Sequence, residues 1–409
     1  MKLLYLGIVT FCLFPYLAIL PIETDSQPNA LILSCLSLII LLIRNPISIT
    51  RDFLYLLIIA IISVVLVAFS SDSFAALRCS ANYVSLFIVT YVCYTFIKQF
   101  GIINYNFFKV IVIIWFTVGL IQTLINPTFL LFLQPRNIIA EAFLSDRGGR
   151  GVLGLAPEPT YYGFVCLQQL IFAIINYAQC KRIKLYILLI ISQLLLFNRS
   201  TTALLMMILA FIIYMCINLS SINIKILKLF IGGGILLLII TIAVSTTETR
   251  MGKVIRNIYE GKNIAVEDAS ANERLAHIIV STKGSIDNFG FPNGYEKFSD
   301  YYKGEVRNGG ELYSDYLSRG AENKIMSSIG GMMFELGFFI SLLFFTVIFK
   351  IYKYAKHNNQ ILLFCLILYT LCLLNALPFA QGFNCLLLAN ILYIKDYSKG
   401  LNYAHSSSN

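Results

Sequence analysis

Residues 53–70 read Phe53-Leu-Tyr-Leu-Leu-Ile-Ile-Ala-Ile-Ile-Ser-Val-Val-Leu-Val-Ala-Phe-Ser70 and contain no charged side chain. A transmembrane helix needs about 20 mostly apolar residues, because each residue adds about 1.5 Å and the hydrocarbon of a bilayer is about 30 Å thick. This stretch therefore has nearly the length, and fully the composition, of a helix that crosses a bilayer. Many similar stretches occur in the chain, and together they decide its fold class.

Hydrophobic residues make up 58% of the 409 residues and charged residues only 13%. Soluble domains have about 45–50% and 25%, so lipid has to cover part of this apolar surface. The same length criterion predicts twelve spans, near 4–20, 29–43, 53–70, 75–97, 107–125, 152–178, 183–198, 202–219, 223–244, 328–349, 359–376 and 379–395. Two of them are short and only Asn375–Pro378 separates the last pair, so we predict an all-α polytopic membrane protein with 11–12 spans.

The charge of the loops between these spans predicts their orientation. With a cytoplasmic N-terminus, the inner loops hold 15 of the 31 basic residues, offset only by Asp52 and Asp396. Because Lys and Arg accumulate on the cytoplasmic side, we place both termini in the cytoplasm and interpret the first apolar run as an uncleaved helix. The net charge of +10 then reflects topology, and no nucleic-acid partner is expected.

One predicted outer loop is far longer than the other connections. It holds 83 residues with 11 basic and 12 acidic side chains. Structureless loops of this length are uncommon, and helix-like stretches such as Val254–Tyr259 and Asn272–Ile279 indicate that it is folded. The expected parts are spans one to nine at 1–244 with a first outer loop at 126–151, the large extracytoplasmic loop at 245–327, and the last three spans with a short tail at 328–409.

The clearest candidate for chemistry is a carboxylate in an irregular part of the sixth span. Glu158 stands between Pro157 and Pro159 in Gly151-Val-Leu-Gly-Leu-Ala-Pro-Glu-Pro-Thr-Tyr-Tyr-Gly163. Prolines interrupt a helix, and irregular backbone at membrane depth is tolerated only where protein or a wet cavity surrounds it. A carboxylate there serves as a general base or binds a sugar hydroxyl. The structural alternative is that Glu158 pairs with an arginine and only stabilises the fold.

Arg199 lies in the tight outer turn Asn198-Arg-Ser-Thr-Thr-Ala203. Its planar guanidinium suits a phosphate. The hydroxyl residues Ser200, Thr201 and Thr202 open the next span, where free backbone N–H groups also favour an anion. The alternative is that Arg199 extends to the lipid headgroups and binds no substrate.

Four further arginines complete the basic set on the outer side. Arg147 and Arg150 lie on glycine-rich backbone just before Glu158, and Arg274 begins a helix-like run in the large loop. Arg78 stands one turn inside the fourth span, where it either reaches the headgroups or joins the same basic pocket. These side chains are candidates for binding diphosphates or acidic sugars.

Glu335, in Phe334-Glu-Leu-Gly337 of the tenth span, is a second carboxylate at membrane depth. His277 is the only histidine on the outer side, so no histidine-based zinc site is expected. A single histidine is more often structural than catalytic, and both readings stay open for His277. The ten cysteines lie in or beside apolar runs without metal or redox spacing. With no Walker loop or His-Glu-x-x-His motif either, we expect no metal and no cofactor.

Four of these features follow one another in a characteristic order. They are Arg150-Gly-Val-Leu-Gly-Leu-Ala-Pro-Glu-Pro159, Asn198-Arg-Ser-Thr-Thr-Ala-Leu-Leu205, Arg274 ahead of Gly290 and Gly294, and Phe334-Glu-Leu-Gly337. In this order, and with one large outer loop late in the chain, residues 145–345 resemble the bacterial O-antigen polymerases and their relatives, the O-antigen ligases.

The resemblance implies a metal-independent glycosyltransferase of the bacterial inner membrane that uses undecaprenyl-diphosphate-linked oligosaccharides, with its large loop in the periplasm. Arg199 and Arg274 match arginine positions of the family and would meet the charge on the leaving diphosphate. Glu158 would accept the proton of the sugar hydroxyl, while Arg147 and Arg150 would hold the second diphosphate or an acidic sugar. A polysaccharide chain-length regulator is an expected partner.

One departure from the family pattern bears on the reaction. The ligases carry a His-Asn pair shortly before the Glu-x-Gly segment, whereas Asn323–Gly330 contains no histidine. This favours a polymerase over a ligase and leaves the base open. A flippase of the same lipid-linked sugar is the rival transporter, although it would not need a folded loop and usually shows repetition between halves. An envelope assembly factor is the third alternative, and it would not require charges at membrane depth.

Overall fold

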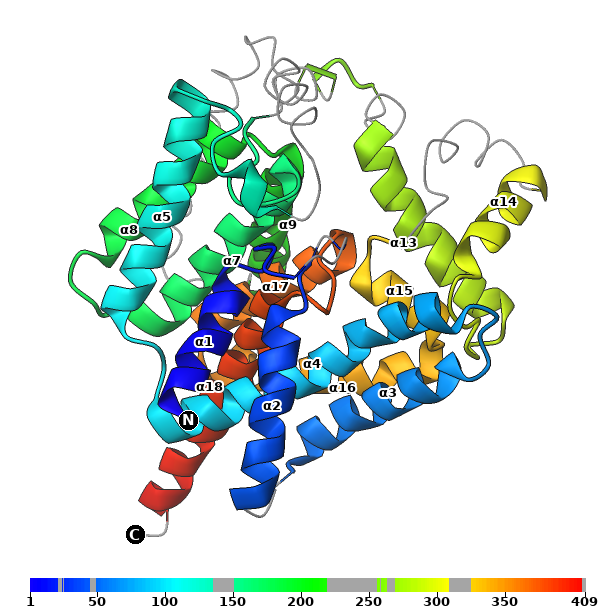
Figure 1. The fold of residues 1–409 in the computed structure, drawn as a ribbon, viewed down its shortest axis with the longest axis horizontal. Coiled ribbons are helices and arrows are strands. Elements are labelled where there is room, and N and C mark those ends of the chain that lie inside the picture. The colour runs from blue at the N-terminus through cyan, green and yellow to red at the C-terminus, as the bar shows by residue number, and fades with distance from the viewer. Residues whose placement is uncertain are drawn as a thin grey trace.

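The computed structural model describes residues 1–20, 24, 26–44, 49–134, 151–218, 256–257, 259–262, 269–308 and 325–406. Within these residues the protein has fourteen α-helices and no strand (Figure 1), which confirms the all-α prediction. Four helices are long and apolar enough to cross a membrane, namely α4 (Ser73–Phe100), α5 (Tyr105–Leu124), α9 (Thr201–Asn218) and α16 (Phe338–Asn358). The larger number of 11–12 spans stays a prediction.

The remaining ten helices comprise eight that overlap predicted spans and two that lie in the predicted large loop. They are α1 (Lys2–Leu13), α2 (Asn29–Arg44), α3 (Arg51–Val67), α7 (Pro159–Tyr177), α8 (Ile183–Ser192), α13 (Ala269–Asp287), α14 (Phe298–Asn308), α15 (Ser328–Glu335), α17 (Gln360–Asn375) and α18 (Gly382–Ser406). The helix-like stretch Asn272–Ile279 of the large loop lies inside α13, which confirms that this part of the loop is helical. The predicted span at 223–244 lies outside the described residues.

Three predicted spans are helical over only part of their length, and proline or glycine explains each case. The first ends at Leu13 because Pro15 cannot continue a helix. The sixth is irregular up to Glu158 and becomes helical at Pro159. The tenth is divided into α15 and α16 at Gly337, whose φ of +85° is a conformation that favours glycine.

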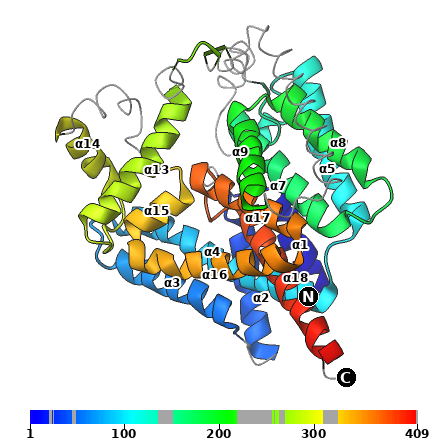
Figure 2. The ribbon, with the colours of Figure 1, turned by 180° about the vertical axis from the view of Figure 1, so that it is seen from behind.

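The long helix α4 lies at the centre of one group of helices, in contact with α1, α2, α3 and α18, while α7 packs on α8, α9 and α17. Figure 2 shows the second group from behind, with α9 and α17 in front of α7. Both chain ends lie toward the same edge of the molecule, and α1 packs on α18 (Figure 1). The predicted orientation, with both termini on one side, requires this arrangement.

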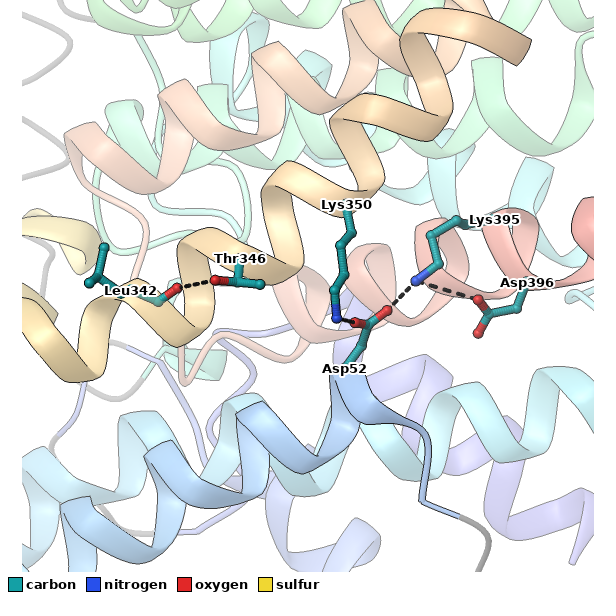
Figure 3. A network of polar contacts seen from close by, with 6 residues as sticks. All are labelled: Asp52, Leu342, Thr346, Lys350, Lys395 and Asp396. Atoms are coloured by element: carbon teal, nitrogen blue, oxygen red, sulfur yellow. Dashed lines mark hydrogen bonds and ion pairs between the residues drawn. The ribbon is translucent and has the colours of Figure 1, made fainter.

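An ion-pair network joins α3, α16 and α18 (Figure 3). Asp52, in the first turn of α3, accepts a hydrogen bond from Lys350 Nζ of α16 at 2.8 Å and another from Lys395 of α18. Lys395 also lies 3.4 Å from Asp396, whose other oxygen accepts the hydroxyl of Tyr94. The Lys395 side chain is only 3% exposed, so the network holds its charge away from water.

Candidate functional site

The irregular segment before α7 is held in place by a glutamine of α5. The Gly154 N–H donates to Gln122 Oε1 at 2.7 Å, and Gln122 Nε2 donates to the Gly154 carbonyl at 2.9 Å. Gly154 has a φ of +61°, so the chain turns sharply there. An apolar surrounding requires every backbone polar group to find a partner, and Gln122 supplies two bonds to this stretch. The irregular backbone predicted from Pro157 and Pro159 is therefore present, and protein surrounds it.

Glu158 is the N-cap residue of α7, with extended backbone and a half-buried side chain. Its carboxylate makes no capping hydrogen bond to the helix, and Pro159 fills the first helical position. A proline is favoured there because its missing N–H would be unsatisfied in any case. The local sequence thus positions the carboxylate at the start of a helix without using it to cap that helix.

Asn198 connects the Glu158 segment to the turn that carries Arg199. Its Nδ2 donates to the carbonyl of Pro159, and its Oδ1 accepts the N–H of Ser200 at 2.9 Å. Asn198 ends a short π-helix, Gln193–Asn198, that continues α8. Insertions of this kind in helices occur frequently at functional sites. The amide side chain of Asn198 therefore joins the two candidate segments.

Two glycines make this close approach sterically feasible. A Cβ on Gly151 would lie 2.2 Å from the carbonyl oxygen of Asn198, and the Val152 N–H donates to the Phe197 carbonyl at 2.9 Å. A Cβ on Gly163 would lie 2.7 Å from Asn198 Oδ1. Side chains at either position would push the segments apart.

Gly151→Ala adds only one methyl group, but it is expected to disrupt the contact between the two segments and to destabilise the protein. The φ of +87° costs a residue with a side chain about 1–3 kcal/mol, and the new methyl group would also meet fixed backbone. Gly101→Ala is the matched control, because Gly101 has a similar φ of +80° and nothing within 4 Å of its Cβ position. The melting temperature of the purified protein, beside the amount of protein in the cell, is the measurement. Equal effects of the two substitutions would contradict the close-approach explanation.

Arg199 adopts the left-handed conformation, with a φ of +50°. Its side chain is exposed, and its Nε donates to the Leu196 carbonyl at 3.2 Å. No other side-chain hydrogen bond or ion pair links the guanidinium to a residue in the described part of the chain. A left-handed residue other than glycine costs about 1–3 kcal/mol and is found preferentially at functional sites. The turn therefore holds a strained arginine with an exposed side chain.

Arg274 reaches the same place from the large loop. It is buried on α13, and its Nη1 donates to the hydroxyl of Thr202 in the first turn of α9. The two residues are 72 positions apart in the chain. The predicted anion site at the start of α9 and the predicted loop arginine are therefore in direct contact.

His277 lies one turn after Arg274 on α13 and is buried. Its Nδ1 accepts the N–H of Met326 at 3.0 Å, and its ring packs edge-on against Phe298 with centroids 5.6 Å apart. An imidazole that accepts at Nδ1 carries its proton on Nε2 when neutral. His277 thus joins α13 to the segment just before α15.

A residue that the sequence analysis missed stands directly before Arg274. Glu273 is half-buried on α13, and burial raises the pKa of its carboxyl although Arg274 acts in the opposite direction. Carboxyl groups whose pKa moves toward neutrality are candidates for acid–base chemistry. The signal in the sequence is an acidic residue adjacent to the candidate arginine on a loop helix.

Two other candidates lie apart from this cluster. Arg78 is exposed on α4 and makes no hydrogen bond or ion pair with any residue that the structure describes, so no contact joins it to the predicted basic pocket. Glu335, at the end of α15, accepts the hydroxyl of Tyr83 at 2.6 Å. Its neighbour Phe334 packs on Gly284, ten residues after Arg274 and so about 15 Å further along α13. Arg147 and Arg150 lie outside the described residues.

The described residues define an all-helical protein in which a proline-bounded carboxylate, a strained arginine and a buried loop arginine stand on segments in mutual contact. Within the described ranges, no group of three or more metal-binding side chains is close enough to hold an ion. No protein-family model matches the chain, and no curated protein matches it in sequence.

Proposed function

We propose that this chain is a polytopic protein of the bacterial cytoplasmic membrane that polymerises undecaprenyl-diphosphate-linked oligosaccharide repeat units at the outer face. The observation that carries the proposal is the hydrogen bond from Arg274 to Thr202. With the Asn198–Pro159 contact, it gathers the segments of Glu158, Arg199 and Arg274 at one place. These are the three residues that a transfer between diphosphate-linked sugars would use most directly.

In the proposed reaction a hydroxyl of the incoming repeat unit attacks the anomeric carbon of the growing chain. The bond from that carbon to the diphosphate oxygen breaks, and undecaprenyl diphosphate departs with the electron pair. Arg199 and Arg274 stabilise the charge that develops on the diphosphate, while Glu158 accepts the proton of the attacking hydroxyl. Both substrates carry lipid tails in one bilayer, which lowers the entropic cost of bringing them together.

An O-antigen ligase is the second candidate, and one contact favours it. His277 accepts the N–H of Met326, so the histidine lies against the segment in which ligases of the resembled family carry theirs. His277→Ala and His277→Gln separate the two readings. A polymerase with a structural His277 tolerates glutamine, whereas a ligase that uses the imidazole loses activity with both.

The test of the proposed function is a strain that lacks this gene, with and without the gene restored. Surface polysaccharide on a gel is expected to change from a ladder to a single band one repeat unit long, because ligation continues without polymerisation. Polymer that accumulates on the polyprenyl carrier would indicate a ligase instead. Single repeats trapped on the cytoplasmic side would indicate a flippase, and an unchanged ladder would reject all three.

A further inference from the structure

The turn between α13 and α14 carries exposed apolar side chains. Ile286 is 68% exposed, Phe289 84% and Phe291 62%, although the turn lies within the loop predicted to be outside the membrane. Contiguous exposed apolar side chains in a soluble region indicate an interaction surface. The depth of this turn in the molecule shows what the surface would contact.

The length of helix α16 gives a first estimate of the depth of the turn. The rings of Phe291 and Phe339 lie 5.8 Å apart, and Gly290 lies directly against Phe338, the first residue of α16. Lys350, in the ion-pair network, follows Phe338 by twelve residues or about 18 Å of helix. Hydrocarbon is about 30 Å thick. If the network marks the inner boundary, the turn is therefore at hydrocarbon depth, and any tilt of α16 only lowers it further.

Helix α3 gives a second estimate of the depth from the same network. The hydroxyl of Tyr295 donates to the carbonyl of Ser63 at 2.7 Å, and Tyr295 is buried. Ser63 follows Asp52, which belongs to the same ion-pair network, by eleven residues or about 16 Å of helix. The two estimates agree, so Phe291 and Tyr295 both lie within the thickness of the hydrocarbon layer when the network marks its inner boundary.

The backbone of the turn meets the condition for apolar surroundings. The N–H groups of residues 289, 290, 291, 293 and 294 all donate to carbonyls, two of them to Phe334 and Glu335, and residue 292 is a proline. The side chain of Asn288 donates to the carbonyls of Phe291 and Pro292 at 3.1 and 3.0 Å. Irregular backbone at membrane depth needs such pairing. Besides the apolar side chains, the turn exposes the carboxylate of Asp287, which accepts the hydroxyl of Tyr301 at 2.5 Å and lies 3.7 Å from Lys283 Nζ. A charge at membrane depth needs such partners.

From these observations we infer that residues 286–295 re-enter the hydrocarbon layer of the bilayer and that lipid acyl chains cover Ile286, Phe289 and Phe291. The inference rests on the membrane location proposed above but not on the reaction. The exposed side chains of Phe338, Phe339 and Leu342 on α16 continue the same apolar surface into the span, which favours lipid over a soluble partner.

The re-entrant turn anchors the helix that carries Arg274. Arg274 stands twelve residues before Ile286 on α13, so it lies up to about 18 Å beyond the anchor. Added to the depth from α16, this gives Arg274 a height of at most about 36 Å above the ion-pair network, which reaches past about 30 Å of hydrocarbon to the outer headgroups. A lipid-linked diphosphate occupies that level.

The test uses the full-length protein in nanodiscs, and each variant gains one tryptophan at an exposed aromatic position. The variants are Phe289→Trp, Phe349→Trp on the lipid-facing side of α16 as the lipid control, and Tyr259→Trp, 93% exposed in the loop, as the water control. The native Trp115 is buried and contributes a constant background. Quenching by lipids brominated on their acyl chains is compared with quenching by acrylamide in water.

Phe289→Trp is expected to be quenched by brominated lipid to about the same extent as Phe349→Trp, and to resist acrylamide. Quenching by acrylamide alone, as for Tyr259→Trp, would overturn the inference. Protection from both quenchers would also overturn it, in favour of contact with a second copy or another protein. A Phe349→Trp that brominated lipid fails to quench would reject the membrane location itself. A negative gel result with intact lipid quenching would reject only the proposed reaction.

Discussion

Arg274→Ala is expected to abolish polymer while the protein remains in the membrane. Removing one group that stabilises developing negative charge typically costs about 10²–10³-fold in rate, and Arg274 is buried where water replaces its charge poorly. Arg274→Lys keeps the charge but loses the planar fork that binds phosphate oxygens in pairs, so it is expected to restore only short chains. The measurement is the length distribution of surface polysaccharide, normalised to the amount of protein on an immunoblot.

Two further variants distinguish a role of Arg274 in binding the diphosphate from a role in folding. Thr202→Val removes the hydroxyl that accepts from Arg274 but leaves both arginines, so a shortened ladder is expected. Arg307→Ala, at an exposed arginine of α14 in the same loop, is the matched control and should leave the ladder unchanged. A wild-type ladder from Arg274→Ala would reject the proposed site. If Arg274→Ala protein disappears from the membrane, Arg274→Lys decides the question.

Asp52→Ala is expected to destabilise the helix bundle more than any other single change near the predicted cytoplasmic side. Asp52 compensates two lysines, and the side chain of Lys395 is only 3% exposed. Removing one partner of a buried ion pair leaves an uncompensated charge and typically costs about 3–5 kcal/mol. Lys350 is more exposed and can turn toward water, so most of this effect is expected to come from Lys395.

This effect is measured by thermal unfolding in detergent, followed with a dye that does not react with the cysteine thiols. Lys395→Met in the Asp52→Ala background removes the orphaned charge and is expected to recover much of the lost stability. Lys353→Ala is the matched control, because Lys353 is an exposed lysine on α16, one turn from Lys350. An Asp52→Ala protein that unfolds at the same temperature as Lys353→Ala would show that the network contributes little.

Much of the helical order is local in origin and was predictable from the sequence. The charge-free run that forms most of α3 and the helix-like stretch inside α13 are examples. The departures occur at Pro15, Pro159 and Gly337, where a missing donor or a positive φ interrupts the helix. The sequence analysis predicted the interruption at Pro157 and Pro159. It did not predict the one at Gly337, because a single glycine within an apolar run is common in transmembrane spans.

The candidate site was predictable as a set of residues but not as an arrangement. Glu158, Arg199 and Arg274 were selected for their chemistry, and the structure places their segments in contact through Asn198 and Thr202. Arg78 and Glu335 were selected by the same reasoning, yet neither has a described contact with that cluster. Charge at membrane depth identifies unusual residues, but it does not say which of them meet.

The sequence by itself determined that the described chain is helical and where most helices begin and end, because apolar length, proline and glycine act on the backbone within a few residues. Only the tertiary structure decided which charges and hydroxyls meet. Arg274 and Thr202 are 72 residues apart, and Lys395 and Asp52 are 343 apart. Such pairs depend on which helix faces pack together, and the spacing of residues along the sequence does not predict that packing.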